Sequence, residues 1–248
     1  MTSRRARNTA PQEIRAPAQQ LSQNQILSKL PAAELAEITS QAEEMWCDLR
    51  QELFQQSEQV RFVYFPLTAM ASLLVVLSDG TAIEAMTVGR EGFVGVQLLS
   101  GVKSARYKGV CQIEGTFLVL ESEVFLSIID SLPSLKRRLQ RYSQYASEVL
   151  AQSAACNSVH NLRERCAKWL LITADAAGSN EFRLTQEFLS QMLGVRRAGV
   201  AEALSDLVEK RLLSKSYGQI KVVDVDGLKS AACECYETIS SKARELLT

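Results

Sequence analysis

The chain has 248 residues, with 28 basic side chains against 28 acidic ones, and 46% of its residues are hydrophobic. These values are ordinary for one or two globular domains, and they exclude collagen-like, mucin-like and wholly disordered chains. The longest largely apolar run, from Ala69 to Leu77, is about half of the roughly 20 residues that a membrane-spanning helix needs. No apolar leader opens the chain, so we expect a cytoplasmic protein without a membrane contact.

Cysteines and charges narrow the search for function. Six cysteines are scattered over a chain long enough to build its own core, so we expect reduced thiols; they are Cys47, Cys111, Cys156, Cys166, Cys233 and Cys235. The first 130 residues carry 11 basic and 15 acidic side chains, whereas the remainder carries 17 and 13. A surplus of four basic side chains does not by itself establish nucleic-acid binding, but it indicates the second part as the place to look for it.

The first half of the chain predicts a tail, two short helices and a β domain. Residues 1–20 have the composition of an unstructured tail, and the apolar spacing of residues 21–44 indicates two short helices. Short runs rich in β-branched and aromatic residues then predict strands at Val60 to Phe65, Ala71 to Leu77, Thr81 to Val88, Gly109 to Ile113 and Thr116 to Leu120. Asp79-Gly80 between two of these runs is a hairpin signal. Residues 21–132 are thus predicted to form a compact antiparallel β domain.

A long helix is predicted over residues 133–160. Its apolar and small residues follow steps of four and three, the seam of a two-stranded coiled coil; they are Leu135, Leu139, Tyr142, Ala146, Val149, Ser153 and Cys156. We expect two chains to pack along this seam. The alternative is that the helix buries the same stripe against its own β domain.

The segment from Leu184 to Leu213 has the spacing of a helix-turn-helix. Thr185 can cap a first helix, and Gly194 allows the left-handed turn that ends it. A second helix is predicted from about Arg197 to Lys210. The small and apolar residues of the motif fall where the two helices pack or turn; they are Leu189, Ser190, Leu193, Val195, Val200 and Ala203.

The second helix and a predicted β wing supply groups that suit DNA. The outward face of this helix carries Arg196 and Arg197, which can read base edges in a major groove. Two short strands around Tyr217-Gly218 form the wing and can bring lysines to phosphates. The predicted DNA-binding residues are Thr185, Gln186, Arg196, Arg197, Ala201, Glu202, Ser205, Lys215, Tyr217 and Lys221. The alternative is an ordinary helical hairpin with solvated arginines.

The order of these parts resembles the Crp/Fnr family of bacterial transcription regulators, most specifically in QEFLSQMLGVRRAGVAEAL. The resemblance implies an α+β fold: an N-terminal antiparallel β-roll like a cyclic-nucleotide-binding jelly roll, a dimerisation helix, and a winged helix-turn-helix domain over residues 161–248. It implies a homodimer that binds a double-stranded DNA operator, with RNA polymerase as a candidate further partner. Where the family's recognition helix has an arginine, an acidic residue and a second arginine, this chain has Arg197, Ala198 and Glu202. The family's best-known operator sequence therefore does not carry over.

The resemblance also locates an effector pocket. Family members that sense cyclic nucleotides hold phosphate and ribose with Gly-Glu-x-Gly and an arginine followed by serine or alanine. The comparable residues here are Gly92, Phe93, Gly95, Arg106 and Tyr107. Phe93 replaces the carboxylate and Tyr107 the small residue, and an unpaired polar ligand group costs about 1 to 3 kcal/mol. We therefore expect no tight binding of cyclic AMP, and the effector is unknown.

Metal sites and enzyme chemistry find little support in the sequence. Iron–sulfur members of the family carry a close cluster of cysteines near the N-terminus, and this sequence has no such cluster. The single histidine, His160, is interpreted as a structural or surface residue. Cys233-Glu234-Cys235 offers two thiolates without supporting ligands, so we predict no metal and no cofactor. No constellation for acid–base or nucleophilic work is found. We conclude that the chain is a DNA-binding regulator; the alternatives are a cyclic-nucleotide-binding signalling module without DNA binding and an enzyme.

Overall fold

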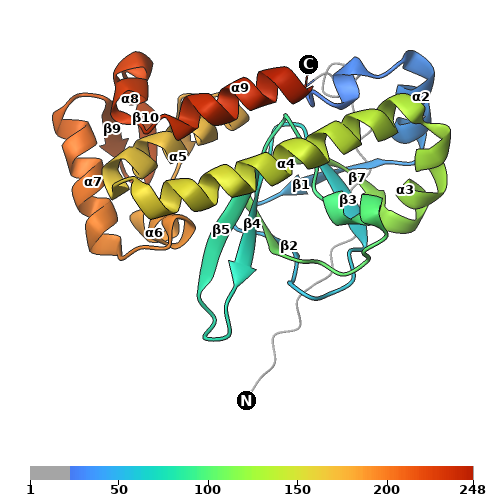
Figure 1. Cartoon of the computed structure of the whole chain (residues 1–248), viewed down its shortest axis with the longest axis horizontal. Coiled ribbons are helices and arrows are strands. Elements are labelled where there is room, and N and C mark those ends of the chain that lie inside the picture. Colours follow the sequence, from blue (N-terminus) through green and yellow to red (C-terminus); the bar gives the residue numbers. More distant parts are fainter. Residues whose placement is uncertain (1–22, 248) are drawn as a thin grey trace.

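The computed structural model describes residues 23–247 (Figure 1). The tail predicted for residues 1–20 lies outside the described residues. The chain then forms a 3₁₀ turn at Leu27–Lys29 and helix α2 at Ala32–Ser40, which are the two short helices expected. Two short strands, β1 (Glu43–Cys47) and β2 (Glu52–Phe54), follow and were not predicted. Their alternation of polar and apolar residues is too brief to stand out from a turn.

The β domain consists of two antiparallel sheets. One sheet has the order β1-β7-β3 and the other β2-β6-β4-β5. The remaining strands are β3 (Phe62–Pro66), β4 (Met70–Val76), β5 (Ala82–Val88), β6 (Lys108–Ile113) and β7 (Gly115–Glu121). The five predicted strands are confirmed to within two residues at either end.

The predicted hairpin at Asp79-Gly80 is also confirmed. The Leu77 N–H donates to the Thr81 carbonyl at 2.8 Å, and Gly80 has a φ of +85°. Glycine adopts this left-handed conformation without the Cβ clash that other residues meet. The turn joins β4 to β5, which reach furthest from the body of the β domain (Figure 1).

A short helix, α3 (Ser122–Ile128), and a 3₁₀ turn (Ile129–Ser131) lead into the 27-residue helix α4 (Pro133–Val159). The carboxylate of Glu34 caps the start of α4, because its two oxygens accept the backbone N–H groups of Ser134 and Leu135 at 3.1 and 2.9 Å. Burial alone raises the pKa of a carboxyl, but these hydrogen bonds outweigh it and lower the pKa of Glu34. The long helix is thereby fixed to the N-terminal segment.

The stripe of α4 that we predicted as a dimer seam is covered within a single chain. Of its residues, Leu135, Leu139, Tyr142, Ala146, Val149 and Cys156 are buried, and Ser153 is half-buried. The stripe packs on the β domain and on the last helix, α9 (Cys235–Leu247), which runs beside α4 (Figure 1). This is the alternative considered above, and the stripe is not free to join two chains. A heptad pattern reports that a face is buried, not which element covers it.

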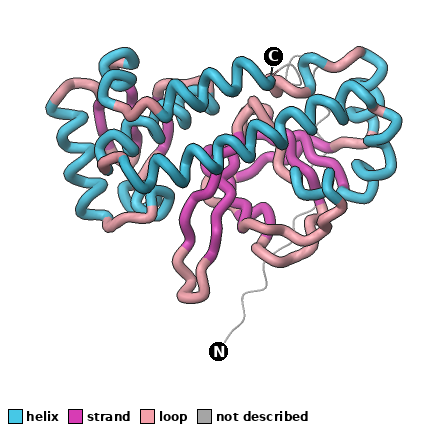
Figure 2. Tube along the Cα trace, in the orientation of Figure 1, coloured by secondary structure: helices cyan, strands magenta, loops and turns pink. Residues whose placement is uncertain are grey.

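The C-terminal part is built mainly of helices around a small sheet (Figure 2). Its elements are α5 (Leu162–Ala177), β8 (Glu181–Arg183), α6 (Gln186–Leu193), α7 (Arg197–Glu209), β9 (Leu213–Ser216), β10 (Gln219–Val222) and α8 (Val225–Ala231). The three strands pair in the order β8-β10-β9. No helix within residues 23–247 is long and apolar enough to cross a membrane.

Candidate nucleic-acid interface

Helix α6 begins and ends where the sequence predicts. Thr185 caps it, because its Oγ1 accepts the Phe188 backbone N–H at 3.2 Å. The first N–H groups of a helix lack partners within the helix, and a hydroxyl cap satisfies one of them. Gly194 ends the helix with a φ of +64°. This left-handed residue turns the chain toward α7.

Helix α7 rests on a buried inner face. Val200, Ala203 and Leu204 are buried, as predicted for the residues that point inward. Ser190 of α6 is buried as well, and its small side chain lets the two helices approach closely. The packing leaves the opposite face of α7 toward solvent, with Arg196, Arg197, Glu202 and Ser205 exposed and Ala201 half-buried.

The predicted wing is present. Strands β9 and β10 pair antiparallel, and Tyr217 and Gly218 join them with φ values of +39° and +76°. Lys215 and Lys221 are exposed, and the Tyr217 side chain is fully exposed at the tip. The Lys221 ammonium lies 3.8 Å from a carboxylate oxygen of Glu181 on β8. A pair this exposed contributes little, so a phosphate can replace it.

A contact that sequence reasoning missed joins the β domain to the start of α6. The Arg50 guanidinium donates to Thr185 Oγ1 at 2.7 Å and lies over the Phe188 ring, 5.5 Å from its centre. The Thr185 hydroxyl accepts two hydrogen bonds and keeps its own proton to donate. Arg50 stands in the turn between β1 and β2, which nothing in the local sequence links to the helix-turn-helix.

Comparison with known proteins agrees with this geometry. Residues 164–231 match the profile of the Crp-like helix-turn-helix domain. A comparison of the sequence with curated proteins finds no match. Solved structures of regulators resemble the fold over about three quarters of the chain, at sequence identities too low to show more than the fold.

Three of these structures illustrate the likeness. A CRP-family transcriptional regulator of Thermus thermophilus is 21% identical with a TM-score of 0.55, over 75% of this chain and 95% of that one. FixK2 of Bradyrhizobium japonicum is 17% identical with a TM-score of 0.58, over 77% and 98%. The c-di-GMP-responsive global regulator CLP of Xanthomonas campestris is 13% identical with a TM-score of 0.61, over 77% and 99%.

Residues 164–231 thus form a Crp-like helix-turn-helix domain, and the fold of the chain resembles that of Crp/Fnr transcriptional regulators. The predicted fold class is thereby confirmed: an N-terminal antiparallel β domain, a long helix and a C-terminal helix-turn-helix.

The predicted effector residues of the β domain fall into different surroundings. Phe93 is buried, and its ring stacks on Phe65 at 5.6 Å and contacts Tyr142 at 5.5 Å between ring centres. Gly92 lies directly beneath Tyr142, since a Cβ at this position would be 2.3 Å from the Tyr142 ring. Arg106 is exposed. Phe93 is thus a core residue whose side chain packs among aromatic rings.

A small cavity of about 240 Å³ lies between the β domain and the C-terminal part. Side chains of β5, α4, α5 and α9 line it, among them the charged residues Glu84, Glu91 and Lys168. Glu84 accepts hydrogen bonds from Ser72 Oγ and Trp169 Nε1, both at 2.6 Å. Burial raises the pKa of Glu84, and these hydrogen bonds and the Lys168 ammonium counter only part of that rise. A polar network therefore joins the hairpin β4–β5 to α5.

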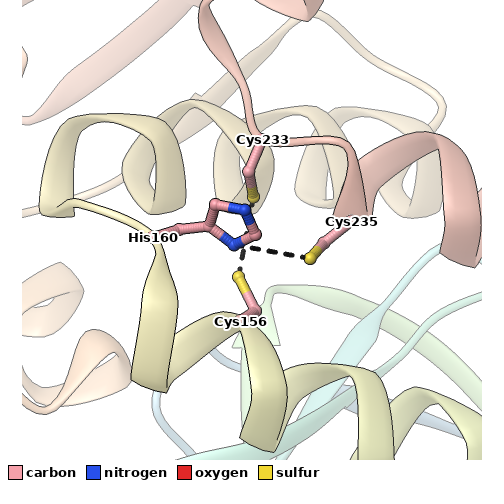
Figure 3. A group of neighbouring side chains, drawn as sticks. All are labelled: Cys156, His160, Cys233 and Cys235. Carbon is pink, nitrogen blue, oxygen red and sulfur yellow. Dashed lines mark hydrogen bonds between the residues drawn. The ribbon is translucent and has the colours of Figure 1, made fainter.

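The structure brings together three cysteines and the single histidine, which we call the Cys3His cluster (Cys156, His160, Cys233 and Cys235; Figure 3). Their ligand atoms all lie within 4.8 Å of one another. Cys156 lies in the last turn of α4, and the His160 backbone N–H donates to its carbonyl at 3.1 Å. Cys233 lies in the link from α8 to α9, and Cys235 begins α9. The prediction that Cys233-Glu234-Cys235 lacks further ligands is wrong.

The three thiols of the cluster differ in acidity. Burial raises the pKa of Cys233 to about 12 and raises that of Cys235. Burial also acts on Cys156, but the Lys168 ammonium and hydrogen bonds from neighbouring groups outweigh it and lower the pKa of this thiol. Lys168 is itself buried, and its Nζ lies 3.3 Å from Cys156 Sγ.

Proposed function

We propose that the protein binds a two-fold symmetric DNA operator as a homodimer, with α7 in the major groove and the β9–β10 wing on the backbone. The observation that carries the proposal is the two-sided character of α7. Its inner face is buried against α6, while its outer face carries a row of Arg197, half-buried Ala201 and Ser205 at steps of four, with exposed Arg196 just before it. Such a row matches the hydrogen-bonding groups of base edges.

The remaining predicted contacts are proposed to position the domain. Thr185 and Gln186 stand at the start of α6, where N–H groups and the positive end of the helix dipole attract a phosphate. Lys215, Tyr217 and Lys221 extend from the wing toward the neighbouring backbone. Contacts of this kind fix register and carry no sequence information.

Dimerisation is proposed through the exposed face of α4, because the opposite stripe is covered within the chain. This exposed face also follows steps of three and four; its residues are Gln144, Ser147, Ala151, Ala154 and Ser158. Small side chains at this spacing let two helices approach closely. The occupant is a second copy of this chain, since each chain supplies one helix-turn-helix and a palindromic operator needs two.

Footprinting and sedimentation together test the proposal. We expect two protected half-sites about 34 Å apart, or a multiple of that distance, and a dimer at the same protein concentration. The substitution Ala151→Glu should abolish both, because it places like charges face to face, whereas Ala33→Glu on an exposed position of α2 should change neither. Protection of one isolated half-site by a monomer contradicts the proposal.

The effector of the β domain is proposed not to be a cyclic nucleotide. Phe93 occupies the core, and no carboxylate stands at that position to bind a ribose. Titration calorimetry with cyclic AMP and cyclic GMP should give no micromolar binding. Micromolar binding of either nucleotide, together with higher operator affinity, would contradict this part.

A further inference from the structure

We propose that the Cys3His cluster binds a single zinc ion. Three thiolates and one imidazole form a donor set that zinc uses in closed tetrahedral sites. The four residues come from two segments 73 to 79 positions apart in sequence, the end of α4 and the start of α9. The inference does not depend on DNA binding.

Two of the distances between ligand atoms match those of a tetrahedral ion, and all of them are within 4.8 Å. With Zn–S bonds of about 2.3 Å and Zn–N bonds of about 2.0 Å, neighbouring ligand atoms of a tetrahedron are about 3.5 to 3.8 Å apart. The Sγ atoms of Cys156 and Cys233 are 3.6 Å apart, and Cys235 Sγ lies 3.6 Å from His160 Nδ1 (Figure 3). Two separate edges thus have the required length. A cluster of several iron ions needs ligands spread more widely.

The surroundings orient the ligands as a metal site requires. The other ring nitrogen of His160, Nε2, lies 3.0 Å from a carboxylate oxygen of Glu234, which leaves Nδ1 as the atom facing the sulfurs. A carboxylate behind the histidine is the usual outer partner of a zinc ligand. Gln152 Nε2 donates to Cys235 Sγ at 3.0 Å, and Lys168 Nζ donates to Cys156 Sγ at 3.3 Å.

The charge also balances. Zinc with three thiolates and a neutral imidazole carries one negative charge, and Lys168 supplies one positive charge within the buried site. A buried lysine is costly without a partner, and this arrangement gives it one. Binding displaces the thiol protons to solvent, so that no oxidant or reductant takes part.

A disulfide is the competing use of these thiols. The 3.6 Å between Cys156 and Cys233 sulfurs exceeds the bond length of about 2.05 Å, and forming the bond would leave His160 and Cys235 without a role. All six cysteines of the chain are free thiols. The donor set therefore favours the metal.

The first test measures metal in the full-length protein, purified without a metal-affinity tag and without chelators. Elemental mass spectrometry should find one zinc per chain, and X-ray absorption should give three sulfur and one nitrogen neighbours at about 2.3 and 2.0 Å. Replacement by Co²⁺ should give the thiolate charge-transfer and intense d–d bands of a tetrahedral site. Copper, iron or no metal, both as purified and after reconstitution with ZnCl₂ under reducing conditions, would overturn the proposal.

Variants test whether these residues hold the ion. Cys233→Ser should lose the zinc, whereas Cys166→Ser, which removes a buried thiol of α5 outside the cluster, should keep it. In case Cys233→Ser fails to fold, Glu234→Ala leaves every ligand in place and should weaken zinc affinity by about 10- to 100-fold in a competition titration. Asp226→Ala on α8 is its matched control and should keep the wild-type affinity. Equal affinity in Glu234→Ala and wild type, or a Cys156–Cys233 disulfide in protein prepared with zinc, would overturn the assignment.

Discussion

At the scale of residues, we expect Arg197 and Lys221 to have different roles on DNA. Arg197 begins the exposed face of α7, and Lys221 lies on the wing beside Glu181. Arg197→Ala should cost about 1 to 3 kcal/mol on the operator and relax the preference at one base pair, because a bidentate contact to guanine is lost. Lys221→Ala should weaken operator and random DNA alike and reduce the slope of log K against log salt by about one.

Measuring the affinity of both variants for operator and random DNA over a series of salt concentrations distinguishes a base contact from a backbone contact. Lys136→Ala, at the far end of α4, is the control and should leave both affinities unchanged. If Arg197→Ala loses affinity equally on operator and random DNA, then Arg197 contacts the backbone and does not read a base.

We expect Glu84 to make the stability of the protein depend on pH. Burial raises its pKa in the folded chain, so the folded state holds the proton more tightly than the unfolded one, and the free energy of unfolding falls as pH rises through that range. The groups that face it are Ser72 on β4, Thr87 on β5, and Lys168 and Trp169 on α5. Glu84→Gln stays neutral and keeps an acceptor oxygen for Trp169. Relative to wild type, the variant should therefore gain stability as the pH rises above the ordinary glutamate pKa of about 4.3.

Urea unfolding midpoints at several pH values measure this gain. Glu123→Gln, an exposed glutamate on α3, controls for the loss of a surface carboxylate. Parallel pH profiles for Glu84→Gln and wild type would show that the network holds Glu84 as a stable anion.

At the scale of elements, the turn at Gly194 sets the angle between α6 and α7. Alanine there must adopt a φ of +64°, and its Cβ would lie 3.3 Å from the Ile83 side chain on β5. We expect Gly194→Ala to cost about 1 to 2 kcal/mol of stability, because left-handed backbone strains a residue with a Cβ. It should also lower operator affinity, since the strain relaxes by tilting α7.

Gly101→Ala separates the two effects. Gly101 has a φ of +75° and open space around it, in the β domain. This substitution should lower the unfolding midpoint to a similar extent while operator affinity of the folded protein stays constant. Equal operator affinity for both variants would show that the turn at Gly194 tolerates the change.

The helices and strands can be predicted from local sequence, whereas the elements that pack against them cannot. Asp79-Gly80 predicts a hairpin and Thr185 with Gly194 bounds a helix, because a turn or a cap depends on neighbours within a few residues. The seven-residue spacing in α4 records a buried stripe, but the covering element, α9, begins 76 residues after the helix ends. The spacing Cys156-x-x-x-His160 at the end of α4, with Cys233-x-Cys235, was the available signal for the cluster. This spacing indicates a metal site only once α9 is known to pack beside α4, because that packing brings the four residues together.

At the scale of the whole molecule, the proposed zinc site joins the end of α4 to the start of α9. Bound at 1,000 times its dissociation constant, an ion adds about 4 kcal/mol to stability. Removing it with a chelator should therefore lower the melting temperature by on the order of 10 °C. Hydrogen exchange should rise in residues 225–247 more than in β4 and β5.

The matched measurement uses Cys233→Ser, which should show the lower melting temperature already without chelator and no further change with it. A wild-type protein whose melting temperature and exchange are the same with and without chelator would contradict a stabilising role for the metal.

Lys168 lies between the proposed zinc site and the cavity, so we expect it to couple binding at the two places. Its ammonium donates to Cys156 Sγ, acts electrostatically on Glu84, and lines the cavity between the β domain and the C-terminal part. A negatively charged small molecule that binds the Lys168 ammonium in the cavity would leave the negative charge of the proposed zinc site less well compensated. By thermodynamic linkage, bound zinc would then reduce the affinity for the small molecule by the same factor. Zinc in the cluster and a small molecule in the cavity would then each lower the affinity for the other, because both depend on the one positive charge of Lys168 on α5.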